Sequence, residues 1–213
     1  MRPAYPNAAI EGRRRHPSAS ARSRCEPEVG QRVLAPLEQD RDCRAGSPIP
    51  RERIRIVHIS VQRTHVHLIV EADGKQALAR GLQGFQISAA RNVNTMLGAG
   101  AHRRRRGRVF ADRYHLEVIT TPTRARHALS HVLNNFRKHG EDRAGLASTW
   151  LVDPFSSGIS FPDWKELADS AVMWPIRDGY DPLVVRRPRS WLLRDGWKRA
   201  GEISAREVPS RRA

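Results

Sequence analysis

Residues 62–71, QRTHVHLIVE, restrict the fold more than any other stretch of this chain. Their apolar side chains alternate as in a strand with one buried face: Val66, Leu68 and Val70. His65 and His67 also lie two residues apart, so both imidazoles point to the other face of the strand and are neighbours there. The stretch therefore predicts a sheet that presents a pair of histidines on one face.

Two further stretches have the composition of strands. Residues 54–62, IRIVHISVQ, are rich in β-branched side chains, and a short turn at Arg63 would pair them antiparallel with residues 64–71. Residues 108–120, RVFADRYHLEVIT, predict another strand later in the chain. We therefore expect an antiparallel sheet built around a hairpin.

Two other stretches have the period of amphipathic helices. Residues 75–97 place apolar side chains at steps of three and four: Leu78, Leu82, Phe85, Ala89, Val93 and Met96. Residues 123–140 show a similar stripe: Ala125, Leu129, Val132 and Phe136. Thr121 or Thr123 is the expected cap of this second helix and Gly140 its expected end. Its polar face carries His127, His131 and Asn135 at steps of four.

The residues alone leave two interpretations of the histidine pair open. Neighbouring carbonyls could satisfy His65 and His67 on a half-exposed face, because histidine is commonly intermediate in burial. Alternatively the two imidazoles supply converging nitrogens to a divalent metal ion. A metal site needs a third ligand, and the second helix offers His131 and Asn135 if it crosses the sheet near the pair.

Four blocks in series resemble the single-tyrosine HUH transposases, and among them the REP-associated tyrosine transposases. The blocks are HVHLIV on a strand, a long amphipathic helix, GRVFADRYH, and a helix that carries HVLNNFRKHG. They follow the family's order and spacing from about residue 53 to 145, with His65 and His67 as the His-hydrophobe-His motif. The resemblance implies an α+β fold related to ferredoxin and RRM domains, with an antiparallel sheet and helices packed on one face. It also favours the metal interpretation.

The resemblance implies a chemistry as well. In this family two histidines and a polar side chain hold Mg²⁺ or Mn²⁺, which polarises a scissile phosphate of single-stranded DNA. A tyrosine one turn before the third ligand attacks and forms a phosphotyrosine link. Carried over to this chain, the metal ligands are His65, His67 and Asn135, and the tyrosine position is occupied by His131. Tyr114, in the GRVFADRYH block, is the candidate replacement nucleophile.

Because the tyrosine is absent, the sequence leaves the enzymatic activity open. One hypothesis is a nuclease of DNA transposition that cleaves and joins single-stranded DNA. A second is a DNA-binding protein without catalysis, and a third is the decayed remnant of a transposase that folds poorly.

The two ends of the chain depart from the resemblance. The family's domain begins with a strand and a helix, and residues 1–50 show no convincing version of either. We therefore expect an irregular basic extension over residues 1–50 and a sheet whose first strand is missing or altered. The HUH-like domain is predicted over residues 51–146, and a second basic extension over residues 147–213.

The charge of the chain favours a polyanionic partner. Thirty-eight Lys and Arg against 22 Asp and Glu give a formal net charge of +16. With the resemblance, the predicted partner is single-stranded or hairpin DNA. The predicted phosphate contacts are Arg103, Arg104, Arg105, Arg106, Arg108, Arg124 and Lys138. No apolar run has the length of a membrane span and no secretory signal is evident, so we expect a cytoplasmic protein.

Overall fold

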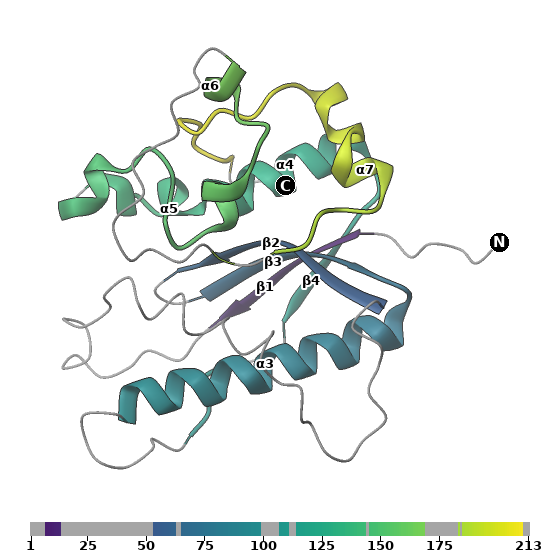
Figure 1. The fold of residues 1–213 in the computed structure, drawn as a ribbon, viewed down its shortest axis with the longest axis vertical. Coiled ribbons are helices and arrows are strands. Elements are labelled where there is room, and N and C mark those ends of the chain that lie inside the picture. The colour runs from purple at the N-terminus through teal and green to yellow at the C-terminus, as the bar shows by residue number, and fades with distance from the viewer. Residues whose placement is uncertain are drawn as a thin grey trace.

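The centre of the computed structural model is a four-stranded antiparallel sheet, with the strand order β2-β3-β1-β4 (Figure 1). The structure describes residues 7–13, 53–62, 65–98, 107–110, 114–143, 145–168, 183 and 185–210. The strands are β1 (Asn7–Arg13), β2 (Ile54–Val61), β3 (His65–Ala72) and β4 (His115–Ile119). The predicted hairpin is confirmed, because β2 and β3 pair antiparallel from Ile54 opposite Ala72 to Val61 opposite Val66.

Helices cover both faces of this sheet. Helix α3 (Lys75–Gly98) lies on one face, whereas α4 (Pro122–Leu133), α5 (Asn135–Lys138) and α7 (Trp191–Arg194) lie on the other (Figure 1). Shorter helices are α6 (Lys165–Ala168) and the 3-10 turns η4 (Glu141–Arg143), η5 (Gly145–Thr149), η6 (Ser157–Ser160) and η7 (Gly196–Ala200).

The predicted α+β class with an antiparallel sheet is confirmed, but the helices are not confined to one face. The physical reason is that β2 and β3 carry apolar side chains at both odd and even positions, and therefore on both faces of the sheet. Leu68 and Val70 pack with Leu82 and Phe85 of α3, and on the other face Val57 and Ile69 pack with Ala125 and Leu129 of α4. A sheet with two apolar faces must be covered on both.

The prediction of a missing first strand is wrong. Strand β1 lies in the middle of the sheet, between β3 and β4. Its sequence, NAAIEGR, has few of the β-branched and aromatic residues that mark strands. Two hydrogen-bonded neighbours nevertheless hold it in place, and Ile10 is buried on the α3 side.

The second predicted helix is divided in two. Thr121 caps α4, since its side-chain oxygen accepts a hydrogen bond from the Arg124 N–H at 3.3 Å. The helix ends at Leu133, and α5 continues after a turn at Asn134. Gly140 follows with a φ of +67°, a left-handed conformation that glycine adopts without strain. This turn carries His139 at the end of α5.

The C-terminal part of the chain completes the core on the α4 side. Trp164, Trp197 and Ile203 are buried there, in the same apolar cluster as Leu129 and Leu133. The described residues after position 147 therefore contribute to the folded core, whereas a basic extension was expected over residues 147–213. Among the described residues, no helix has both the length and the apolar character needed to span a membrane.

Candidate metal centre

The predicted histidine pair lies on the face of β3 that looks toward α4. His65 and His67 are both buried, and their ring centroids are 4.7 Å apart in an edge-to-face arrangement. The alternation of β3 explains this placement, because Val66 and Leu68 point to the α3 side. The two imidazoles are thus held on a rigid strand inside the protein.

Asn135 reaches the same place from the start of α5. Its Nδ2 atom lies 3.1 Å from Nε2 of His65, across 70 residues of sequence. Its Oδ1 atom is buried, and among the described residues it has no hydrogen-bond partner. The two ends of an amide are nearly isosteric, so a half-turn of this group would direct the oxygen toward the imidazole. The predicted third ligand is therefore next to the pair, with an oxygen that still requires a partner.

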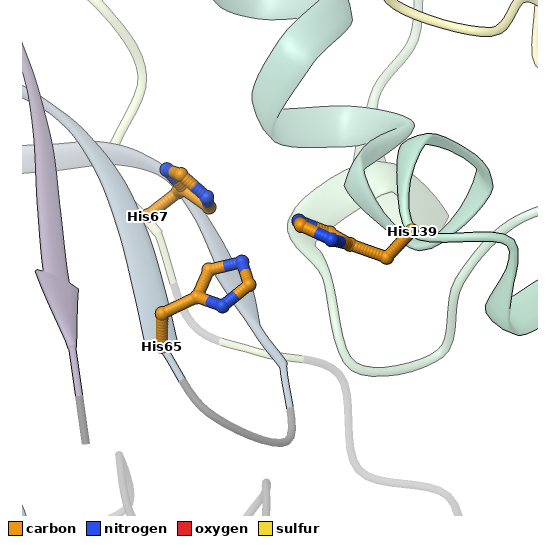
Figure 2. Close-up of side chains that lie close together, drawn as sticks. All are labelled: His65, His67 and His139. Carbon is orange, nitrogen blue, oxygen red and sulfur yellow. The ribbon is translucent and has the colours of Figure 1, made fainter. Parts of the chain in front are cut away.

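His139 also belongs to this cluster, although the sequence analysis did not select it. Its ring centroid is 4.7 Å from that of His65, and Figure 2 shows its side chain directed from the end of α5 toward the strand. One ring nitrogen from each of His65, His67 and His139 lies within 4.8 Å of the other two. A signal was present in the sequence, because His139 is four residues after Asn135 and thus one helical turn further on.

His131 lies at the edge of the cluster. Its ring centroid is 4.9 Å from that of His67, and the Lys138 Nζ is 3.3 Å from its Nδ1. His131 also lines a pocket of about 170 Å³ between α4 and the C-terminal segment, residues 201–210. His131, which the sequence resemblance placed at the tyrosine position, is therefore close to the predicted ligands and lines a cavity.

The surroundings keep His67 neutral. The pKa of the His67 imidazole is lowered to about 2, first by burial and then by the nearby His131, His65, Lys138 and His139. A neutral imidazole has a nitrogen lone pair for a metal ion. Burial also lowers the pKa of His58 to about 4, but Nδ1 of His58 lies 3.1 Å from the Ser157 hydroxyl and His58 is not part of the cluster.

Three other predicted residues that the structure describes lie apart from this cluster. Tyr114 packs against the apolar cluster on the α3 side, on the opposite face of the sheet from His67. Arg124 is exposed at the start of α4, and Arg108 is exposed before β4. The run of Arg103–106 falls outside the described residues. Among the predicted phosphate contacts that the structure describes, Lys138 lies beside the histidines.

Comparison with known proteins adds a distant similarity of fold. No protein-family model and no curated protein matches the sequence. Among solved structures, the chain is similar to a REP-associated tyrosine transposase bound to a REP hairpin, with a TM-score of 0.47 and 14% sequence identity, over 89% of this chain and 96% of that chain.

Proposed function

We propose that this protein is a metal-dependent, HUH-type binder of single-stranded or hairpin DNA in which His131 has replaced the tyrosine nucleophile. The observation that carries the proposal is the meeting of His65 and His67 on β3 with Asn135 on α5. These are the three ligands that the sequence resemblance implies. They come from two elements that are far apart in the chain, and they meet in a buried place.

The donor set fits a divalent ion. His65 and His67 offer imidazole nitrogens, and Asn135 offers a buried amide oxygen that has no hydrogen-bond partner in the described part of the chain. An orphaned buried carbonyl costs about 1–3 kcal/mol, and a bound cation would remove that cost. When bound, the ion supplies Lewis-acid polarisation of a phosphate oxygen. Lys138, beside His131, adds a positive charge that would hold the DNA backbone.

The residue at position 131 determines whether the site can form a covalent link to DNA or can only bind it. The imidazole of His131 is shorter than a phenol and carries no hydroxyl oxygen, so it cannot form the phosphotyrosine link. Tyr114 lies on the other face of the sheet and is a poor substitute. We therefore propose that the protein holds DNA at this site without trapping it covalently. Two buried apolar clusters, one on each face of the sheet, support a folded binding protein rather than a remnant that folds poorly.

The experiment measures binding and covalent trapping side by side. A fluorescent single-stranded DNA is titrated with the full chain in the presence and absence of Mn²⁺, and denaturing gels then detect adducts. We expect metal-stimulated binding and no adduct from the chain as it stands, and an adduct from His131→Tyr with Mn²⁺. The double variant His65→Ala/His67→Ala should lose the metal stimulation.

Two results would contradict the proposal. Equal DNA binding with and without Mn²⁺ would remove the metal from it. An adduct from the unaltered chain that disappears in His131→Ala would show that His131 is itself a nucleophile, and one that disappears in Tyr114→Phe would show that the nucleophile has moved.

A further inference from the structure

His139 extends the cluster beyond the three ligands that the resemblance implies. It is exposed, yet its ring turns back over the end of α5 toward His65 (Figure 2). The backbone explains this direction, because the His139 N–H donates to the Asn135 carbonyl at 3.3 Å and Gly140 then reverses the chain. The turn that carries Asn135 thus also carries His139 to the site.

The geometry separates His139 from the other histidine nearby. The ring nitrogens of His65, His67 and His139 lie within 4.8 Å of one another, and His131 is not part of that group. Side-chain rotation within this range can bring three imidazoles to one ion, since metal–nitrogen bonds are about 2.0–2.1 Å long. His131 instead has Lys138 at 3.3 Å, a cation that disfavours a metal ion at that ring.

The chemistry of the resulting donor set is selective. Among the described residues, no Asp or Glu joins the group. Mg²⁺ prefers oxygen ligands and gives up its water reluctantly, whereas imidazole suits Zn²⁺, Co²⁺, Ni²⁺ and Cu²⁺. A set of neutral ligands also leaves the two positive charges of the ion uncompensated, and these charges attract an anionic phosphate.

We infer that His139 is a metal ligand together with His65 and His67, and that this three-imidazole set selects a late transition-metal ion over Mg²⁺. The inference rests on the metal site of the proposed function and names the class of ion that this site takes. With two imidazoles and one amide, oxygen-preferring ions would compete more closely. With a third imidazole the preference shifts to nitrogen-preferring ions.

The test measures metal binding directly, without DNA and without an activity assay. The full chain is titrated with Co²⁺, whose visible absorption reports its ligands, and separately with Mg²⁺ by calorimetry. We expect Co²⁺ to bind at least ~100-fold more tightly than Mg²⁺. His139→Ala should weaken Co²⁺ binding by at least ~10-fold and change the absorption spectrum, with little change for Mg²⁺.

A matched histidine variant controls for the loss of an imidazole from the neighbouring helix α4. His127→Ala removes a half-buried imidazole from α4, twelve residues before His139, and should leave the Co²⁺ affinity and spectrum unchanged. His139 is exposed, so its removal leaves the apolar core intact. Circular dichroism of His139→Ala should therefore match that of the unaltered chain.

The outcomes separate this inference from the proposed function. If His139→Ala binds Co²⁺ like the unaltered chain while His65→Ala/His67→Ala does not, His139 is not a ligand and the metal site of the proposed function stands. If Mg²⁺ binds as tightly as Co²⁺, the selectivity is wrong. If the unaltered chain binds neither ion, the inference and the metal site of the proposed function both fail.

Discussion

Asp153 is a buried carboxyl group outside the candidate metal centre, and its surroundings make it sensitive to pH. Its Oδ2 accepts a hydrogen bond from the Gln62 amide at 2.7 Å, and its Oδ1 accepts one from the Phe155 N–H at 2.8 Å. Burial nevertheless raises the pKa of Asp153 to about 7, with Glu141 adding to the effect and the two hydrogen bonds opposing it. The folded protein therefore holds a proton here that the unfolded chain releases near pH 4.

This proton predicts a loss of stability as pH rises. Between about pH 4 and 7 the folded state binds more protons at Asp153 than the unfolded state, so this group lowers the free energy of unfolding by up to ~1.4 kcal/mol per pH unit. Asp153→Asn should remove that slope. Urea unfolding at intervals from pH 4.5 to 8 measures this slope, as the pH dependence of the difference in the free energy of unfolding between the variant and the unaltered chain. Asp73→Asn, at an exposed carboxylate, should give no such difference, and parallel profiles for Asp153→Asn would contradict the prediction.

At the scale of elements, α4 and α5 use two faces for two purposes. One face packs on the sheet through Ala125 and Leu129. The other binds the C-terminal segment through side chains at steps of three and four: Arg126, Ser130, Asn134 and Arg137. Arg126 donates to the Glu207 carboxylate at 2.5 and 2.6 Å, and Asn134 and Arg137 donate to backbone carbonyls of residues 204 and 205. The C-terminal segment is therefore held along the helix by charged and polar hydrogen bonds.

Glu207 is the residue whose loss should weaken this docking most. It accepts two hydrogen bonds from Arg126 and one from Ser130. Burial raises its pKa, but these hydrogen bonds and the Arg126 charge outweigh burial, so the pKa is lowered overall and the carboxylate is ionised at neutral pH. Glu207→Ala should reduce the free energy of unfolding by about 1–2 kcal/mol at pH 7.

Glu202→Ala is the matched control in the same segment. The Glu202 side chain is exposed and lies 3.9 Å from Lys165, while its backbone carbonyl, which the substitution keeps, accepts from Arg126. Its removal should change stability by no more than ~0.5 kcal/mol. Urea unfolding measures the free energy of unfolding of both variants. Equal losses would show that the Glu207 carboxylate does not stabilise the docking of this segment.

At the scale of the whole molecule, the C-terminal residues are part of the core. Trp197 is 2% exposed and packs in the cluster that also contains α4 and the sheet. Its ring lies 5.8 Å from that of Phe161, which in turn meets Trp164 at 5.1 Å. Aromatic side chains from two separate segments, residues 161–164 and η7, thus pack together on the α4 side of the sheet.

Trp197→Ala should accordingly destabilise the whole protein. Removing a buried tryptophan leaves a cavity and costs about 3–5 kcal/mol. Trp191→Ala, in the neighbouring helix, should cost about 1 kcal/mol, because that side chain is 48% exposed and its ring is covered on one side by Arg199. Thermal and urea unfolding of the two variants compare them. Similar small losses in the free energy of unfolding for both variants would mean that the core is stable without the C-terminal residues.

Much of the fold, and His65, His67 and Asn135 of the candidate site, could be predicted from the sequence. The strand period set His65 and His67 on one face, and the helical period set Asn135 on the polar face of its helix, because a side chain's direction follows from its neighbours along the chain. The α+β class was what the family resemblance implied. The expectation of a missing strand failed at β1, because NAAIEGR is a strand only through its two partners in the sheet.

The sequence by itself thus determined which residues share a face, and the tertiary structure decided which faces meet. The packing of α4 on the sheet brings Asn135 to His65, and the turn at the end of α5 adds His139, whose step of four from Asn135 indicates a shared helical face but not a place beside His65. Packing also covers both faces of the sheet and docks the C-terminal residues on α4. The physical reason is that such contacts join residues far apart in the chain, and their free energy exists only once the core between them has formed.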